Sequence, residues 1–326
     1  MNYNTYIIAE IGINHEGSFT LCKDMVFAAK KAGVSAIKLQ TIDPSKCYTR
    51  DTESFKLFSK ANLTKKETEK IFDYAKSLKL DVFTTVGDIQ TANWIKKLKP
   101  SAWKISASLL THIPLLEHIA SFKEPIYIST GLSTNKEIDY AVSILKKKNK
   151  KNYSLLHCVS KYPTPPAEAH LSRIDYLKKN YRVNIGYSDH TLGHLACCIA
   201  VSKGASIIEK HFTKNNKKKG YDHQISLDYE GMKELVKNIE ATELMLSNNI
   251  KFLDVVRKNR KKFLRALVAN CKIKKGEKFS EINISAKRVS NNNNSVSPIY
   301  FKKLIGKCSL KNYEADQLII SKELKN

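Results

Sequence analysis

The first 212 residues alternate between short apolar runs and longer amphipathic segments. The runs are rich in β-branched residues and have the length of buried strands, whereas most segments between them repeat apolar positions with the helical period. Because strand and helix alternate, the pattern predicts parallel strands joined by helical crossovers. The eight predicted strands lie at residues 5–12, 35–41, 80–86, 102–108, 124–130, 153–159, 182–188 and 205–212.

Eight strands of this kind are the number that closes a barrel, so the pattern predicts the α/β class and a (β/α)8 TIM barrel. A doubly wound open sheet is the alternative architecture. No G-x-G-x-x-G motif follows any predicted strand, which argues against a dinucleotide-binding sheet. We therefore expect the closed barrel.

The pattern divides the chain into three parts. Residues 1–248 hold the barrel, whose last unit is closed by a helix-period segment at residues 229–248. The stretch 249–262 is basic and poorly periodic, so we interpret it as a linker. Residues 263–326 differ in character and include an Asn-rich loop from Asn291 to Asn294. A tail of about 60 residues is near the lower limit for an independent core, so we expect it to lean on another surface.

Composition indicates a globular protein, with 42% hydrophobic residues. The sequence has no run of about 18 apolar residues and no signal-peptide pattern in its first residues. Seven scattered cysteines without a C-x-x-C motif favour reduced thiols over a disulfide framework. We therefore expect a soluble, cytoplasmic protein without a membrane partner.

The formal net charge of +25 is compatible with nucleic acid, an anionic membrane or anionic metabolites as partners. The lysines lie mainly in loops and on polar helix faces, as at residues 146–151 and 214–220. No aromatic-interleaved basic patch or zinc-finger spacing accompanies them. We interpret most of the charge as solvated surface and expect no nucleic-acid partner.

Two neighbouring strands end in polar residues with a spacing of two. Ser188 and His190 share one face of their strand, and Glu209 and His211 share one face of the next. Two imidazoles and a carboxylate at one sheet edge suit a divalent metal or acid–base chemistry. Asp189 is expected to face the other way.

Other predicted strands also end in polar residues, at the edge where β/α barrels carry function. A lysine inside a barrel is costly unless it meets an anion, and lysines ringed by hydroxyl donors suit a phosphate and a carboxylate. Any single residue of this kind has a structural explanation: a lysine can extend to solvent, and a lone histidine is more often structural, as we interpret His112, His118, His157 and His194. The coincidence of several favours one combined site. The further strand-end residues are Glu10, Lys38, Gln40, Thr84, Thr85, Lys104, Ser106, Ser129, Thr130 and Ser160.

Motifs spread over nearly the whole chain resemble those of one family. In the barrel they are IAEIGINHEG (8–17), IKLQT (37–41), WKIS (103–106), ISTGLST (128–134), YPTP (162–165), GYSDHT (186–191), IEKHFT (208–213) and the set Asp222, His223 and Ser226. Together they resemble the sialic acid synthases, the nonulosonic acid synthase group. In the tail, VANCKIKKGE (268–277) and AKR (286–288) resemble that family's antifreeze-like (SAF) domain.

The resemblance implies a transferase that condenses phosphoenolpyruvate with an open-chain N-acetylated amino sugar and water. The products would be a nine-carbon 2-keto acid and phosphate. It implies that His190 and His211 bind a divalent metal, Mn²⁺ or alternatively Mg²⁺ or Co²⁺. It also implies that Arg288 reaches into the barrel of a partner subunit, so that a domain-swapped homodimer is expected. Phosphoenolpyruvate would be held by Lys38, Thr85, Lys104, Ser129 and Ser188, while Glu10, Gln40, Ser160, Tyr162, Glu209 and Asp222 would face the sugar or the metal-bound groups.

The chain departs from the family pattern mainly on the sugar side. Leu109 stands where the family has an acidic residue, and Ala107 where it has the serine of K-I-x-S. Ser160 replaces a frequent asparagine, residues 85–87 replace a T-P-F segment, and residues 289–294 replace a Pro/Gly turn. An unpaired sugar hydroxyl against a leucine would cost about 1–3 kcal/mol. The acceptor therefore stays open among N-acetylmannosamine, its 2,4-diacetamido trideoxy relatives and less common sugars.

Two other functions are weighed against this one. Another phosphoenolpyruvate-condensing barrel could make a seven- or eight-carbon keto acid from a phosphorylated sugar, but it would need a second phosphate site. A non-catalytic sugar-binding relative would have no need of His190, His211, Lys38 and Lys104 together. Whether Glu10 or Glu209 steers the attacking water is left open.

Overall fold

The computed structural model describes residues 5–247, 251–290 and 294–325. The chain forms two compact units, Met1–Ser247 and Asn248–Asn326, which are described separately. Parts of three predictions fall outside the described residues. They are the stretch expected to lack a signal peptide (residues 1–4), the start of the linker (249–250) and most of the Asn-rich loop (291–293).

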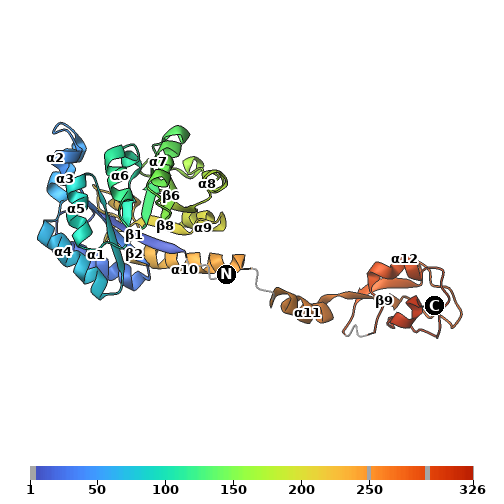
Figure 1. Ribbon diagram of the computed structural model, residues 1–326. Helices are drawn as coiled ribbons and strands as arrows, with labels where there is room; N and C mark the ends of the chain where they lie inside the picture. The colour runs from blue at the N-terminus through green and yellow to red at the C-terminus, as the bar shows by residue number, and fades with distance from the viewer. Residues whose placement is uncertain (1–4, 248–250, 291–293, 326) are drawn as a thin grey trace. The chain divides into compact units, whose positions relative to one another are not determined.

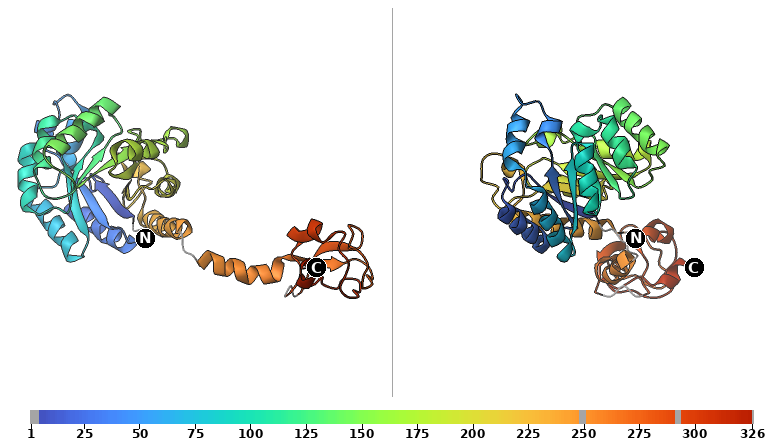
Figure 2. Two further views of the ribbon diagram at one scale, coloured as in Figure 1. Left: turned by 45° about the vertical axis from the view of Figure 1, so that its right-hand side comes forward. Right: turned by 60° about the vertical axis from the view of Figure 1, so that its left-hand side comes forward.

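Eight parallel strands close into a barrel in the first unit (Figures 1 and 2). The open-sheet alternative is wrong, because β1 pairs with β8 in parallel, with Tyr6 opposite Ile207 and Glu10 opposite His211. The predicted TIM barrel is thereby confirmed. The strands are β1 (Tyr6–Gly12), β2 (Ala36–Thr41), β3 (Asp81–Val86), β4 (Trp103–Ile105), β5 (Ile126–Ser129), β6 (Tyr153–Cys158), β7 (Asn184–Asp189) and β8 (Ile207–His211).

An outer layer of helices covers the strands, and local sequence signals set the ends of these helices. Thr64 accepts a hydrogen bond from the Glu67 N–H while the Glu67 carboxylate accepts one from the Thr64 N–H, a capping box. Gly33 ends its helix with a φ of 90°, which glycine adopts without strain. The covering helices are α1 (Phe19–Ala32), α4 (Lys65–Ser77), α5 (Ile89–Lys97), α6 (Ile113–Ala120), α7 (Asn135–Lys147), α8 (Arg173–Tyr181), α9 (Leu195–Ser202) and α10 (Tyr229–Leu246).

The interior of the barrel is apolar at the amino ends of the strands and polar at their carboxyl ends. The apolar floor consists of one buried residue from each of six strands and of Ala102, which comes directly before β4. Side chains two positions apart share a face of a strand, so the residue two positions after each floor residue also faces inward. The floor residues are Ile8, Ala36, Phe83, Ala102, Tyr127, Leu156 and Ile207, and their successors are Glu10, Lys38, Thr85, Lys104, Ser129, Cys158 and Glu209.

A helical insertion that the sequence pattern did not predict follows β2. It consists of α2 (Pro44–Cys47) and α3 (Glu53–Ala61). Asp43 caps the first helix, with Pro44 in its first turn, and Thr52 caps the second. Phe58 and Ala61 pack with apolar residues of the neighbouring loops in a small core of their own.

The second unit begins with α11 (Lys251–Phe263), so the stretch predicted as a linker is helical from Lys251 on. Apolar positions in this stretch gather on one side of the helix and basic ones on the other, so its interpretation as a poorly periodic linker is wrong from Lys251 on. Antiparallel strands β9 (Arg265–Ala269) and β10 (Ile284–Arg288) and the short helix α12 (Phe301–Leu304) follow. They surround a cluster of buried apolar residues that includes Leu267, Phe279 and Tyr313.

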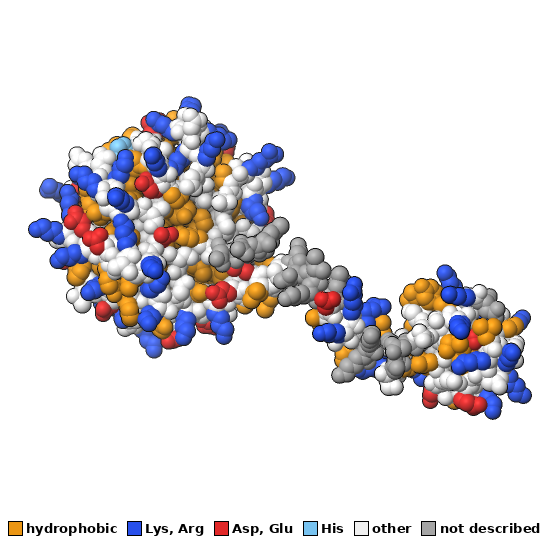
Figure 3. Space-filling model, turned by 60° about the horizontal axis from the view of Figure 1, so that its bottom comes forward, with side chains coloured by type: hydrophobic (Ala, Val, Ile, Leu, Met, Phe, Trp, Pro, Cys, Tyr) orange, Lys and Arg blue, Asp and Glu red, His pale blue; other side chains and the backbone are white. Residues whose placement is uncertain are grey.

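Surface and thiol chemistry agree with the composition. All seven cysteines are free within the described residues. On the face of the first unit that Figure 3 shows, lysine and arginine side chains are dispersed among acidic and apolar ones, as expected for solvated charge. In residues 5–247, 251–290 and 294–325, no helix has both the length and the apolar run that a bilayer crossing requires.

Candidate active site

A cavity of about 550 Å³ opens at the carboxyl ends of the barrel strands. Its wall takes side chains from all eight strands, because the inward-facing residues above the apolar floor end there. The convergence that the sequence predicted is therefore present. The predicted site residues that line the cavity are Glu10, Lys38, Gln40, Thr85, Lys104, Ser129, Ser160, Tyr162, Ser188, His190, Glu209 and His211.

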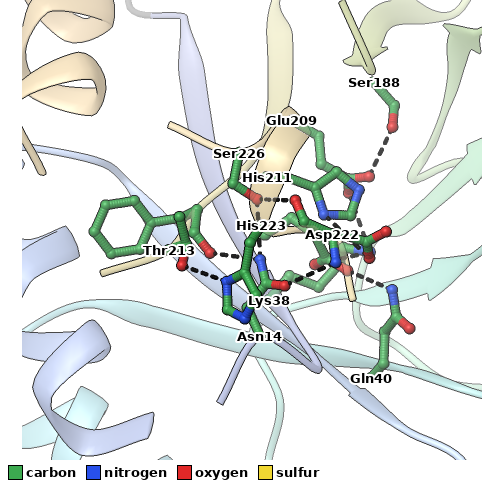
Figure 4. Close-up of polar contacts among 12 residues, drawn as sticks. Asn14, Lys38, Gln40, Ser188, Glu209, His211, Thr213, Asp222, His223 and Ser226 are labelled. Atoms are coloured by element: carbon green, nitrogen blue, oxygen red, sulfur yellow. Dashed lines mark hydrogen bonds and ion pairs between the residues drawn. The ribbon is translucent and has the colours of Figure 1, made fainter. Parts of the chain in front are cut away.

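Two buried lysines and two buried glutamates form one charge network at the base of the cavity. Figure 4 shows part of it, with Lys38 and Glu209 labelled. The Lys38 Nζ atom lies 3.0 Å from Oε2 of Glu10 and 3.5 Å from Oε2 of Glu209. The Lys104 Nζ atom lies 2.7 Å from Oε1 of Glu209. Lys38 and Lys104 are therefore paired with carboxylates of the protein itself, those of Glu10 and Glu209. The sequence had indicated only that an anion was required.

Hydrogen bonds from neighbouring strands complete the network. Ser188 donates its hydroxyl to Oε1 of Glu209 at 2.8 Å, and Gln40 donates its amide to Oε1 of Glu10 at 2.8 Å. Lys38 also donates to the Thr85 hydroxyl at 3.3 Å. Glu209 thus has more donors than Glu10, which predicts different proton affinities for the two carboxylates.

The two glutamates titrate in opposite directions from their ordinary values. Burial raises the pKa of Glu10 to about 7, against the opposing effect of Lys38. Burial also acts to raise the pKa of Glu209, but Lys104 and Lys38 outweigh it and hold that pKa well below its ordinary value. Burial lowers the pKa of Lys104. One carboxylate is therefore firmly ionised, and the other exchanges a proton near neutral pH, a separation typical of acid–base sites.

The two imidazoles lie side by side, with 5.5 Å between the ring centroids of His190 and His211. Nδ1 of His190 lies 2.6 Å from the Val159 carbonyl oxygen and must donate to it, so the lone pair is on Nε2. Nδ1 of His211 is buried and forms no hydrogen bond within the described residues. Burial lowers the pKa of both rings, which favours their neutral, ligating form.

This pair of neutral rings fits a divalent metal site that is open on one side. No three His, Cys, Asp or Glu side chains form a ligand cluster in the part of the chain that the structure describes. Water and substrate oxygen would therefore have to supply the other positions, as in catalytic rather than structural metal sites. The Tyr162 ring covers the pair, with its centroid 4.1 Å from that of His190.

Two predicted site residues, Asp222 and Arg288, remain to be described, and Asp222 does not line the cavity wall. The Asp222 carboxylate approaches from the loop after β8, with Oδ2 3.6 Å from Nδ1 of His211. Arg288 belongs to the second unit, where its guanidinium group lies over the Phe263 ring, 4.5 Å from the centroid. Its predicted approach to a partner barrel stays a prediction.

The structure adds residues to the cavity that the sequence pattern did not single out as binding residues. Some come from the insertion after β2, whose helix caps Asp43 and Thr52 were the available signal. Others follow β4, where His112 lines the cavity besides capping α6, so its structural interpretation was incomplete. Leu109 lines the cavity too, partly buried against the main core. The added residues are Lys46, Cys47, Tyr48, Phe58, Ser108 and His112, whereas Ser106, which also lines the cavity, was among the predicted strand-end residues.

Comparison with known proteins identifies the family. Residues 25–251 match the NeuB family. The chain belongs to the NeuB family. It is 32% identical to the N,N'-diacetyllegionaminic acid synthase of Campylobacter jejuni, over 97% of this chain and 98% of that one. It is 34% identical to a pseudaminic acid synthase of the same species, over 94% of each chain.

A solved structure of a similar protein has the same fold. The sialic acid synthetase of Leptospira borgpetersenii, crystallised with citrate, superposes with a TM-score of 0.73 at 32% identity, over 78% of this chain and 91% of that one. The named relatives are acid synthases, which condense phosphoenolpyruvate, so the prediction of an enzyme of this class is confirmed. The relatives are named for three different acids, and the family match ends at residue 251. The acceptor sugar and the SAF assignment therefore stay predictions.

Proposed function

We propose that this chain is a nonulosonic acid synthase. It condenses phosphoenolpyruvate with an N-acetylated mannosamine-type sugar and water, and it releases a nine-carbon 2-keto sugar acid and phosphate. One observation carries the proposal: in a NeuB-family barrel, Lys38, Lys104, His190 and His211 line a single cavity. The cavity thus combines cationic groups for an anion with two neutral imidazoles for a metal.

The base of the cavity suits the anionic substrate. Lys38 and Lys104 supply positive charge, and the Thr85, Ser129 and Ser188 hydroxyls surround them. Glu10 and Glu209 hold the two ammonium groups in place, so the positive charge is oriented before the anion arrives.

We propose that His190 and His211 hold a divalent ion, Mn²⁺ or alternatively Mg²⁺ or Co²⁺. When bound, such an ion would act as a Lewis acid toward the sugar aldehyde. The buried Nδ1 of His211, which forms no hydrogen bond within the described residues, and the tautomer that Val159 imposes on His190 support this assignment. The Tyr162 ring, tilted over that of His190, would cover this side of the metal site.

Of the two carboxylates, Glu10 suits the proton transfers better. When the enol carbon of phosphoenolpyruvate attacks the sugar aldehyde, C2 becomes electrophilic and a water adds there. That water must lose a proton before phosphate leaves. Lys104 and Lys38 stabilise the ionised form of Glu209 so strongly that it is a weak base. Glu10, with a pKa near 7, can accept the proton, while Glu209 keeps the lysines in place.

The acceptor would lie toward the rim of the cavity. Gln40, Ser160, Tyr162 and Asp222 supply polar groups on that side. Leu109 and the α2–α3 insertion supply apolar ones. This mixture accommodates a sugar that carries N-acetyl groups and hydroxyls.

The experiment that tests the proposal is phosphate release from phosphoenolpyruvate with Mn²⁺ against a panel of acceptors. The panel contains N-acetylmannosamine, a 2,4-diacetamido-2,4,6-trideoxy hexose and a phosphorylated sugar, with a no-acceptor control. Release that depends on an unphosphorylated N-acetylated sugar supports the proposal. Release only with the phosphorylated sugar indicates a related keto-acid synthase, and no release with any sugar indicates a non-catalytic relative.

We also propose that the active form is a homodimer in which Arg288 of one chain serves the barrel of the other. The departures from the family turn after Arg288 make this worth testing directly. Mixing inactive Arg288→Ala and His211→Ala chains should restore part of the activity, because one barrel of each mixed dimer would have both residues. No restoration from chains shown to exchange would contradict the arrangement.

A further inference from the structure

The loop after β8, residues 212–228, carries Asp222 and returns to the strand that it left. A bridge between Phe212 and Leu227 closes its base. The Phe212 N–H donates to the Glu10 carbonyl, and the Leu227 N–H donates to the His211 carbonyl. The loop therefore starts and ends at the edge of the candidate site, and whatever fixes its shape also fixes where the Asp222 carboxylate lies.

Asn14 lies in the loop after β1, and its side chain joins three parts of the loop after β8 (Figure 4). Its amide nitrogen donates to the Phe212 carbonyl at 3.0 Å and to the Ser226 hydroxyl at 2.9 Å. Its amide oxygen accepts the Asp222 N–H at 3.1 Å. The side chain is buried, with 1% of its surface exposed. One amide thus contacts the first residue of the loop, Asp222 itself and the residue that leads back to the strand.

Few residue types can make these three contacts. An amide has two N–H donors and one carbonyl acceptor on a short, planar group. Aspartate has the same shape but no donors, and leucine has neither donors nor acceptor. The hydroxyl of Ser226 in turn donates to the Asp222 carbonyl at 2.6 Å, which closes a ring of hydrogen bonds. The contacts with the loop after β8 therefore explain why position 14 needs an asparagine.

A second tie holds the outer part of the same loop. His223 lies between the Thr213 hydroxyl, 2.7 Å from Nδ1, and the Glu16 carboxylate, 3.0 Å from Nε2. Glu16 also pairs with Lys218 of the loop. Asn14 and Glu16, two residues of the family motif at positions 8–17, thus have structural contacts that the proposed chemistry leaves unexplained. The loop after β1 therefore contacts the loop after β8 at two places, through Asn14 and through Glu16.

We propose that Asn14 is a positioning residue for Asp222. By holding the Asp222 backbone, it sets that carboxylate 3.6 Å from Nδ1 of His211, on the acceptor side of the cavity. We call the three hydrogen bonds of the Asn14 amide the clamp. The consequence for acceptor use rests on the proposed function, but the clamp itself does not. Without the Asn14 amide, the Asp222 N–H and the Phe212 carbonyl lose their partners, and the loop is free to carry the carboxylate away from His211.

Hydrogen exchange tests the clamp independently of any reaction. In Asn14→Ala, the amides of residues 214–226 should exchange at least about 10-fold faster than in the wild type. Asn238→Ala is the matched control, since Asn238 donates one hydrogen bond to His194 outside the cavity, and it should leave these amides unchanged. Asn14→Asp keeps the acceptor for the Asp222 N–H but loses both donors, so it should give an intermediate effect. Unchanged exchange in a folded Asn14→Ala variant overturns the proposal.

Kinetics tests what the clamp does. Residues that orient a functional group typically contribute 10–100-fold to activity, so kcat/KM for the acceptor should fall by about that factor in Asn14→Ala. The KM for phosphoenolpyruvate should not change. In an Asp222→Asn background, Asn14→Ala should cost little more, because the two residues act as one unit. Fully additive losses, or a lower Tm with unchanged acceptor kinetics, overturn the positioning role. If the wild type turns over no acceptor, the proposed function fails, and hydrogen exchange still decides the clamp.

Discussion

Asp189 and Lys210 form a completely buried ion pair, with 2.7 Å between Oδ2 and Nζ. They are register partners on β7 and β8, the two strands that end in the imidazoles. Because side chains alternate, the pair faces away from the cavity, toward the helix that carries Cys197. The expected orientation of Asp189 is confirmed. The pair locks the two strands together directly behind the candidate metal site.

Breaking this pair should destabilise the protein strongly. Asp189→Ala leaves a lysine buried without its counter-charge, which typically costs about 3–5 kcal/mol. Replacing both partners by apolar residues, as in Asp189→Leu with Lys210→Met, should cost less, because no buried charge is then unpaired. Urea unfolding measures both. The exposed pair of Lys203 and Asp175 is the control, and Lys203→Met should change stability by less than about 1 kcal/mol.

Glu10→Gln should become more stable than the wild type as the pH rises. The folded pKa of Glu10, about 7, lies above its ordinary value of 4.5. Its contribution to stability is therefore fully present below about pH 4.5 and is lost as the pH rises through 7. The difference in unfolding free energy should grow between pH 5 and pH 7 and then level off, at on the order of 3 kcal/mol. Denaturation at several pH values checks this, and a pH-independent difference would contradict it.

Lys104→Met should weaken phosphoenolpyruvate binding much more than Lys46→Met. Both lysines line the cavity, but Lys46 lies at its exposed rim between Asp43 and Asp88. Lys104 is buried at the base, and a charge-assisted contact there is worth on the order of 2–3 kcal/mol. The KM for phosphoenolpyruvate should rise by about 100-fold in Lys104→Met and by less than about 3-fold in Lys46→Met. Equal effects would place the anion at the rim instead.

His211→Ala should abolish Mn²⁺ binding and metal-dependent turnover without unfolding the chain. The ring lines the cavity, and its Nδ1 forms no hydrogen bond that holds the fold within the described residues. Electron paramagnetic resonance titration with Mn²⁺ measures binding directly, and circular dichroism checks the fold. His118→Ala, on α6 and bonded to Asn93, is the control and should bind the ion as the wild type does. Normal Mn²⁺ affinity in His211→Ala would remove this residue from the site.

Much of the barrel and its inner face follows from local pattern. β-Branched runs located all eight strands, and the period of two placed Ser188 with His190 and Glu209 with His211. These are properties of single strands, so no long-range information was needed. Closure was indicated only by the number of strands, because the pairing of β1 with β8 joins segments about 200 residues apart.

Contacts between distant loops and strands could not be predicted in the same way. The sequence showed that Lys38 and Lys104 need anions, but the choice of Glu10 and Glu209 depends on how the strands meet across the barrel. Asn14 was part of a family motif without a role, because its partners come from a loop at the other end of the barrel sequence. The insertion after β2 was missed because its helices are short, although their caps were visible.

The apolar floor of the barrel has a consequence for how this enzyme can change. Floor and reactive groups lie two positions apart on the inward face of the same strands, so deleting one residue there would exchange inward and outward side chains along that strand. New acceptor preferences must therefore arise in the connecting segments, above all in residues 42–62 and 106–112, which can vary without disturbing the buried charges. A directed-evolution library restricted to these two segments should retain folded members and shift sugar preference.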